Sequence, residues 1–403
     1  MNELLKITQE LSWPSTDVQE EWKRLASYLD NPAYLCNKVF DDQPMLMEIV
    51  IANGIGPLLY NQLKAGGCLQ SLSENVLERL QQIYFLTAAF NLLLSSEIRA
   101  LVNEFDRAKI PVLWVKGAIL AANLYEDLAL RPAGDLDLIV RSEHVNRAEE
   151  VIKGLGYVLA SPEAFGDFNK EVGHARAYQR RDNKAFTLEL HHALMSSIER
   201  VTPINETWFW DHTTQVSING ASLLTLNQEA NLLYLCGHLV SHHGWEPRFI
   251  WLYDVHRLLE KYKEVFDWEL LNNLVDELNW GPYVSCVLKA AWTFLHTSIP
   301  GAFLAKFGRD EQKSPVLNWQ TRLPPTRAIR TLADWRRIPS LSNRMRFLYH
   351  VFFPTRTYMV YRYQPADQRT WPLLYPYRWG IMLKEGIQTL WSLCRQKGTR
   401  QGL

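Results

Sequence analysis

The feature that most constrains this chain is a change in the period of its apolar residues. Over Leu72–Phe105 they recur at helical spacing, with charged residues between them. Between residues 110 and 192 they form short runs typical of strands, separated by helical segments. The helical period returns over residues 226–274. This order predicts an α+β fold, with a small mixed β-sheet core embedded in a predominantly α-helical chain.

The same pattern divides the 403 residues into four expected regions. Domains of about 100–200 residues are usual, so a chain of this length is expected to hold more than one structural unit. We expect an N-terminal helical region over residues 1–105, an α+β core over 106–215, a second helical region over 216–315, and a basic, aromatic-rich C-terminal region over 316–403.

Charge is unevenly placed along the chain, although the total is zero with 43 Lys and Arg against 43 Asp and Glu. Residues 322–403 hold 15 basic and three acidic residues, a local charge of +12, so residues 1–321 carry −12. Arginines and aromatics alternate in this basic part, as in residues 344–358 and 375–384. The pattern is typical of contact with a membrane surface or another anionic partner. A nucleic-acid partner, and a helical cap whose arginines are solvated or paired with the acidic part, also stay open.

The five cysteines are widely spaced and never occur as CxxC, so neither a disulfide framework nor a thiolate zinc site is expected. The N-terminus lacks the basic and apolar parts of a secretory signal. The sequence has no run of 18 apolar residues, so we expect no membrane-spanning helix. These features predict a cytoplasmic protein, with peripheral contact to a membrane open through the C-terminal region.

Three carboxylates form the central candidate site. Asp135 and Asp137 flank one apolar residue at the start of a predicted strand, so both side chains face the same side, about 7 Å apart along the chain. Oxygen ligands placed in this way suit Mg²⁺. Glu189, in a second predicted strand, is the natural third carboxylate of a two-metal site. A lone Asp-x-Asp is common by chance, and its other interpretation is a pair of solvated acids.

Basic and glycine residues precede these acids. Lys116 and Gly117 lie between a predicted strand and a helix, where glycine permits close backbone approach and the helix start offers N–H groups to an anion. Arg131, four residues before Asp135, is placed to contact the same anion. We expect these three residues to bind the triphosphate of a nucleotide.

The motifs resemble those of the uncharacterised bacterial nucleotidyltransferase family in the polymerase-β-like superfamily, over roughly residues 40–270. The residues that carry the resemblance are Lys116-Gly117, Tyr125, Arg131, Gly134-Asp-Leu-Asp-Leu-Ile-Val, Gly154-Leu-Gly-Tyr and Leu188-Glu-Leu-His, with Ile55-Gly-Pro-Leu-Leu-Tyr upstream and His238 and Trp251 to Asp254 downstream. The resemblance implies a short mixed sheet with flanking helices. It also implies Mg²⁺-dependent transfer of a nucleoside monophosphate from an NTP, with Asp135, Asp137 and Glu189 as metal-binding carboxylates.

The chain departs from the wider superfamily in its phosphate-binding motif. Lys116-Gly117-Ala118 stands where the superfamily usually has Gly-Gly or Gly-Ser. This difference leaves open a non-catalytic member that binds a partner. A metal-dependent glycosyltransferase using its Asp-x-Asp is a less favoured alternative, because that class needs a nucleotide-binding α/β unit of about 100 residues ahead of the motif, and this region is predicted to be helical.

Four further residues are candidates for an acceptor pocket. His238 and His242 are spaced to share one face of a predicted helix. Asp254 lies on the next helix, and His191 is expected to face the same side as Glu189 because side chains alternate along a strand. Structural roles remain open for all four. The expected function is therefore transfer of an NMP group from an NTP to an unidentified acceptor, with two Mg²⁺ ions as cofactors and Mn²⁺ as a compatible substitute.

Overall fold

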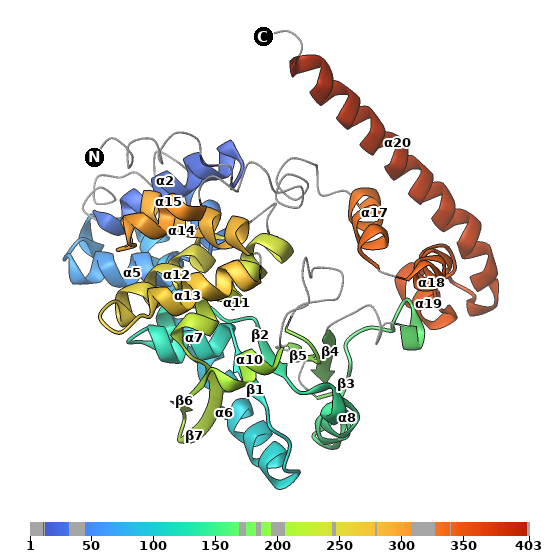
Figure 1. The fold of residues 1–403 in the computed structure, drawn as a ribbon, viewed down its shortest axis with the longest axis horizontal. Helices are drawn as coiled ribbons and strands as arrows, with labels where there is room; N and C mark the ends of the chain where they lie inside the picture. The colour runs from blue at the N-terminus through green and yellow to red at the C-terminus, as the bar shows by residue number, and fades with distance from the viewer. Residues whose placement is uncertain are drawn as a thin grey trace.

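The computed structural model confirms the α+β fold class, with a mixed sheet embedded in a mainly helical chain (Figure 1). The structure describes residues 11, 13–31, 45–168, 175–182, 187–194, 206–243, 247–278, 280–307, 327–338 and 340–400.

The helices of the N-terminal and central parts are α2 (Thr16–Asp30), α4 (Leu46–Ala52), α5 (Gly56–Ala65), η2 (Leu69–Ser71), α6 (Glu74–Arg107), α7 (Gly117–Leu124), η3 (Leu128–Leu130), η4 (Ser142–His144), α8 (Val145–Gly154), η5 (Gly166–Phe168) and α10 (Glu206–Asp211). Those that follow the sheet are α11 (Gln228–His243), α12 (Phe249–Tyr262), α13 (Trp268–Glu277), α14 (Gly281–Leu295), α15 (Gly301–Phe307), α17 (Arg327–Arg337), α18 (Leu341–Phe352), α19 (Arg356–Tyr363), η7 (Gln368–Leu373) and α20 (Leu374–Arg400).

The sheet has seven strands in the order β3-β4-β5-β2-β1-β7-β6. β2 pairs with β5 and β1 with β7 in parallel, and the other neighbours are antiparallel. The strands are β1 (Leu113–Val115), β2 (Asp135–Ile139), β3 (Tyr157–Leu159), β4 (Ala175–Arg180), β5 (Thr187–His191), β6 (Thr213–Ile218) and β7 (Ala221–Leu226). β1, β2 and β5 agree with the strands expected before Lys116, at Asp135 and around Glu189.

The sheet extends beyond the core expected from the sequence. The boundary placed at residue 215 falls inside β6, and β7 continues the sheet to Leu226. Asn219 and Gly220 join these two strands, and both have positive φ angles, of 49° and 76°. This is the backbone of a two-residue hairpin turn, for which Asn-Gly is the preferred sequence. The core region therefore includes the β6–β7 hairpin.

Alternation along the central strands gives the sheet two different faces. Leu136 and Leu138 of β2, with Leu188 and Leu190 of β5, belong to a buried cluster that also contains apolar residues of α6 and α8. Side chains at the intervening positions point to the opposite face. The apolar and acidic residues of the Asp-Leu-Asp-Leu segment are thereby separated, so the acids face away from α6 and α8.

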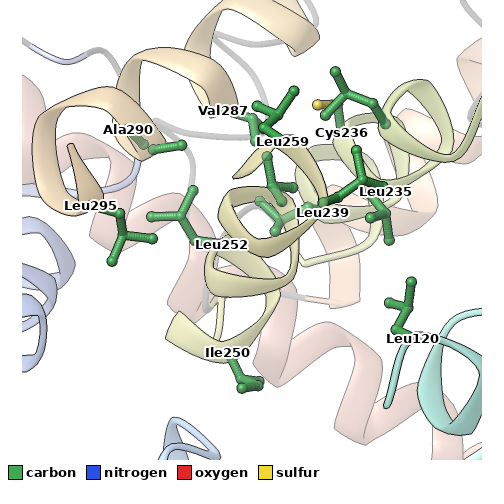
Figure 2. Packing of buried hydrophobic residues seen from close by; sticks show 14 of the residues in the cluster. Leu120, Leu235, Cys236, Leu239, Ile250, Leu252, Leu259, Val287, Ala290 and Leu295 are labelled. Carbon is green, nitrogen blue, oxygen red and sulfur yellow. The ribbon is translucent and has the colours of Figure 1, made fainter. Parts of the chain in front are cut away.

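A second, larger cluster joins this opposite side to the helices that follow the sheet. Leu235, Leu239, Leu252, Leu259 and Val287, from α11, α12 and α14, pack together in its centre (Figure 2). Burial of this many aliphatic side chains is the main stabilising contribution available to such a helical layer. The helices α11 and α12 are thus held rigidly beside the acidic face of the sheet.

Two features of the chain bear on the expectations from the sequence. Cys68 is disulfide-bonded, which the spacing of the cysteines did not indicate, whereas Cys236 and Cys286 are free and buried. Among the described helices, α6 is long and apolar enough to cross a membrane by length and composition alone, and 39% of its most apolar 18 residues are buried. Core helices of soluble proteins can have the same properties.

Polar contacts fix α6 to the segment that leads into β2. The side-chain amide of Asn91, buried in the middle of α6, donates hydrogen bonds to the carbonyl oxygens of Leu128 and Arg131 at 2.5 and 2.9 Å. Buried carbonyl groups need such partners. Asn91 therefore positions the chain immediately before the acidic strand.

Replacement of Asn91 by Ala is expected to lower the free energy of unfolding by about 1–3 kcal/mol, because both carbonyls lose a buried donor. The measurement is urea-induced unfolding. Ser96→Ala is the matched control, since its hydroxyl bonds the Leu92 carbonyl on the exposed side of the same helix; it should cost about 0.5 kcal/mol or less. Equal effects of the two substitutions would contradict the anchoring role.

Candidate active site

The register between β2 and β5 brings the candidate carboxylates together. Asp137 lies directly opposite Glu189, and Ile139 lies opposite His191. Because the strands are parallel and in this register, Asp135, Asp137, Glu189 and His191 all point to the same face. All four line one cavity of about 460 Å³. The expectation that His191 shares a face with Glu189 is confirmed.

The closest contacts converge on Asp137, which is almost fully buried. Its Oδ1 lies 2.9 Å from Lys116 Nζ and 2.9 Å from His191 Nε2, and the same His191 nitrogen lies 3.5 Å from Glu189 Oε2. One ligand atom from each of Asp137, Glu189 and His191 lies within 4.8 Å of the other two. These three side chains form a group able to hold a metal ion.

The cluster also shifts the acidity of its members. Burial, followed by repulsion from Asp137 and Glu189, raises the pKa of Asp135 to about 6. Burial opposes ionisation of Asp137 as well, but Lys116 and the His191 hydrogen bond outweigh it and hold the pKa of Asp137 below its usual range. The hydrogen bond from His191 lowers the pKa of Glu189. Asp135 is thus the carboxylate with least compensation by positive charge.

The donor set fits a divalent cation. Asp137 Oδ2 is buried and has no hydrogen-bond partner among the described residues, although buried carboxylate oxygens are normally satisfied. A cation at this oxygen would satisfy it and relieve the repulsion that raises the pKa of Asp135. Carboxylate oxygens suit both Mg²⁺ and Mn²⁺.

Lys116 and Gly117 have unusual backbone conformations beside these acids. Lys116 has φ 55° and ψ −154°, which is strained for a residue with a side chain, and Gly117 has φ 28°. A Cβ atom at Gly117 would lie 3.1 Å from the backbone oxygen of Asp135. Glycine is therefore required where α7 begins, and the strained residue before it directs the Lys116 ammonium to Asp137.

Arg131 and Asp254 form a buried ion pair. Arg131 Nη2 lies 2.8 Å from Asp254 Oδ2, and the Tyr125 hydroxyl donates to Asp254 Oδ1 at 2.7 Å. Arg131 lines the cavity, but Asp254 is not among the lining residues, so the structure places Asp254 behind Arg131 and away from the expected acceptor pocket. The pair joins the chain before β2 to α12.

Other residues complete the cavity wall. His238, a candidate from the sequence, lines it and stacks on Tyr234 with ring centroids 6.1 Å apart. Ala175 and Ala177 of β4 face the cavity opposite His191 and Glu189, and their small side chains leave the space open. The side chain of His242 lies outside the described residues, although its backbone belongs to α11.

Arg248 is a lining residue that the sequence pattern did not single out. Its Nε donates to the carbonyl of Ala52 at 2.7 Å, and its guanidinium lies 5.7 Å from the Trp251 ring centroid. Burial, and then repulsion from Arg131, lowers the pKa of Arg248. Within the part of the chain that the structure describes, Arg248 forms no ion pair. The sequence feature that could have identified Arg248 is its position immediately before the start of a helix.

The acidity of Asp135 gives a prediction for stability in metal-free buffer. A carboxylate whose pKa is raised from 3.8 to about 6 binds protons more strongly in the folded state, so it destabilises the fold increasingly as pH rises from about 4 to about 6. Asp135→Asn removes this effect and is expected to raise the free energy of unfolding by about 1–3 kcal/mol at pH 8. The gain should disappear near pH 4 in urea unfolding.

Asp137→Asn is the contrasting variant. It leaves Lys116 and His191 buried without their shared carboxylate, so it is expected to destabilise the protein by about 3–5 kcal/mol. The same urea titrations measure this loss. If both variants changed stability in the same direction at pH 8, the charge balance derived from the geometry would be wrong.

Comparison with known proteins identifies the family. A model of the family described as uncharacterised nucleotidyltransferase matches residues 41–296, which is more than half of the chain. The search of curated proteins found no match to this chain. The family match includes every candidate residue of the cavity.

Three solved structures are similar at low identity. Lincomycin-bound LnuA, a lincosamide antibiotic adenylyltransferase, is 12% identical, with a TM-score of 0.29 over 40% of this chain and 94% of that chain. The antibiotic-resistance factor ANT(2'')-Ia is 14% identical, with a TM-score of 0.33 over 51% and 98%. JHP933 from Helicobacter pylori is 19% identical, with a TM-score of 0.27 over 58% and 92%. The family assignment rests on the sequence match, and the chain belongs to the uncharacterised nucleotidyltransferase family, as an enzyme that transfers a nucleoside monophosphate group.

Proposed function

We propose that this enzyme transfers an NMP group from an NTP to an acceptor with the help of divalent cations, Mg²⁺ in the first place and Mn²⁺ as a substitute. The observation that carries the proposal is the register of β2 and β5, which puts Asp137 beside Glu189 with Asp135 on the same cavity wall. In the reaction, an acceptor atom forms a bond to the α-phosphorus while the bond to the leaving pyrophosphate breaks. Such a displacement depends mainly on positioning and on neutralising negative charge.

The three carboxylates have separate parts in this proposal. Asp135 and Asp137 hold the cations, which supply positive charge to the phosphate oxygens when bound. Glu189 assists on the acceptor side, as a ligand or by receiving the acceptor's proton. His191 orients Asp137 and Glu189 through its Nε2 atom. Asp137 thereby has one oxygen fixed by Lys116 and His191 and the other directed to the cation.

Two positions near the cavity are suited to the phosphates. Gly117 begins α7, where the helix start attracts anions and the absence of a side chain permits close approach. Arg248 adds a guanidinium that is not committed to a described carboxylate. Arg131 supplies positive charge from behind, because its own guanidinium is bound to Asp254. We therefore assign the closest phosphate contact to Arg248 in place of Arg131.

The alternatives make different demands on the chain. The described residues before β1 form helices, and this does not favour a glycosyltransferase, which needs an α/β nucleotide-binding unit there. A non-catalytic member that binds a partner is favoured by the contact of Lys116 with Asp137, which places a fixed positive charge at the metal-binding carboxylate. The two remaining functions differ in whether an NTP binds with a divalent cation.

Calorimetry with Mg²⁺ and each NTP in turn tests the site. We expect the wild-type protein to bind at least one NTP only when Mg²⁺ is present, and Asp135→Asn and Asp137→Asn each to abolish that binding. Asp106→Asn, an exposed position at the end of α6, is the matched control and should bind normally. Retained Mg²⁺-dependent binding in either site variant refutes the assignment, and absence of binding in the wild type favours the non-catalytic alternative.

The same mixtures examined by mass spectrometry of the intact protein report transfer to the protein itself. A mass increase of one NMP identifies the donor and makes a protein side chain the acceptor. Without that increase, an active enzyme would use a separate molecule as its acceptor, and candidates range from small molecules to lipid-linked glycans and RNA ends.

Arg248→Gln is expected to weaken Mg²⁺-dependent NTP binding about 10–100-fold, because a charge-assisted hydrogen bond to phosphate contributes roughly 1.5–3 kcal/mol. Arg79→Gln removes an arginine from an exposed ion pair with Glu48 and is the matched control, with affinity unchanged. Normal NTP affinity in Arg248→Gln would contradict this assignment and would mean that Arg131 makes the closest phosphate contact.

A further inference from the structure

The four C-terminal helices α17, α18, α19 and α20 lie to one side of the catalytic core (Figure 1). They attach to it by a small cluster in which Phe165 and Phe168 contact Phe347 and His350 of α18. Thr355 adds a hydrogen bond from its hydroxyl to the Glu163 carbonyl at 2.7 Å. The far end of α20 projects away from the rest of the molecule. Among their described side chains, none lines the cavity that holds the carboxylates.

Large apolar side chains are exposed along α18 and α20. Leu341 and Met345 are spaced by one helical turn on α18, with exposed fractions of 70% and 58%. On α20, Leu383, Ile387 and Trp391 are likewise spaced by one turn, with exposed fractions of 67%, 58% and 59%. Side chains four residues apart lie on the same helix face. Each helix therefore has an exposed apolar face.

Aromatic residues connect the two faces. Phe353, just after α18, lies 5.4 Å from the ring of Tyr349 and 5.4 Å from that of Trp379 on α20. All three rings are exposed. An open groove of about 350 Å³, lined by residues that include Leu332, Phe352 and Met382, adds to the apolar surface. Exposed Trp and Tyr beside aliphatic residues are typical of protein surfaces at the boundary between lipid and water.

Exposed positive charge lies on the same C-terminal segment. Arg356, Arg362, Arg369 and Lys384 are exposed, and within the described residues none of the four forms an ion pair. Neutralisation by the chain's own acids therefore does not account for these four residues. Their charge is available to an anionic partner.

We propose that the exposed face of α18 and α20 docks on an anionic lipid bilayer, which makes the enzyme a peripheral membrane protein. A bilayer matches both properties of the face: its lipid headgroups carry negative charge, and the boundary with the acyl chains accepts Leu, Ile and Trp side chains. A second copy of the chain would place two +12 surfaces against each other in a symmetric dimer. A nucleic acid would leave the aliphatic residues without a partner, since bases stack on aromatic rings.

The inference is independent of the proposed reaction, because the docking face and the catalytic cavity share no residues. It predicts where the reaction takes place. Bound through α18 and α20, the enzyme would meet acceptors that are part of the membrane or held close to its surface.

The test is sedimentation of the full-length protein with vesicles of phosphatidylcholine alone and of phosphatidylcholine mixed with phosphatidylglycerol. We expect binding to the mixed vesicles, weakened by added salt, and little binding to phosphatidylcholine. The triple charge variant Arg362→Gln, Arg369→Gln, Lys384→Gln should weaken binding on the order of 100-fold, since each basic residue contributes about fivefold at an anionic surface.

A triple apolar variant, Leu383→Ser, Ile387→Ser and Trp391→Ser, should also lose binding. Phe85→Ser with Leu86→Ser is the matched control, because these residues are equally exposed on α6, outside the docking face. Circular dichroism checks that each variant keeps its helices. No vesicle binding at low salt, or equal loss in the α6 control, overturns the proposal. A dimer that the apolar variant dissociates, or salt-sensitive RNA binding without vesicle binding, would assign the face to a different partner.

Discussion

The parallel pairing of β2 and β5 is the constraint on which the site depends. It sets Asp137 opposite Glu189, so that two negative charges face one cavity. Leu138 and Leu190, the next residues in the two strands, point to the other face of the sheet and pack in the buried cluster there. A shift of one residue in this register would move the acids to the apolar face and the leucines to the cavity. The hydrophobic effect on one face of the sheet thus fixes the carboxylates on the other.

Placing carboxylates together at low solvent exposure is costly, and the surrounding residues offset this cost unequally. Lys116 and His191 both contact Asp137, so this acid stays ionised, whereas burial and repulsion raise the pKa of Asp135. The strain at Lys116 and the small residues around the cavity belong to the same arrangement. Sites that trade stability for function commonly concentrate such features, and in the proposed function the excess negative charge would attract a cation.

Local patterns explain how much of this could be predicted from the sequence. Alternation along a strand places Asp135 with Asp137 and Glu189 with His191, without knowledge of the fold. The contact between Arg131 and Asp254 spans 123 residues, and the position of Arg248 depends on how α12 packs, so neither follows from local spacing. The β6–β7 hairpin is a different case. Asn219-Gly220 is a strong local signal for a hairpin turn, but the expected core ended at residue 215 and the following residues were assigned to the second helical region.

The most direct test of the central claim is a crystal structure with Mn²⁺ and a non-hydrolysable NTP, in which anomalous scattering locates the metal. Coordination by carboxylates in this site predicts a manganese peak about 2.0–2.4 Å from oxygens of Asp137 and of Asp135 or Glu189, with the triphosphate beside Gly117. The contrary result is a structure in which the nucleotide is bound elsewhere, no anomalous peak lies in the cavity, and Lys116 remains on Asp137.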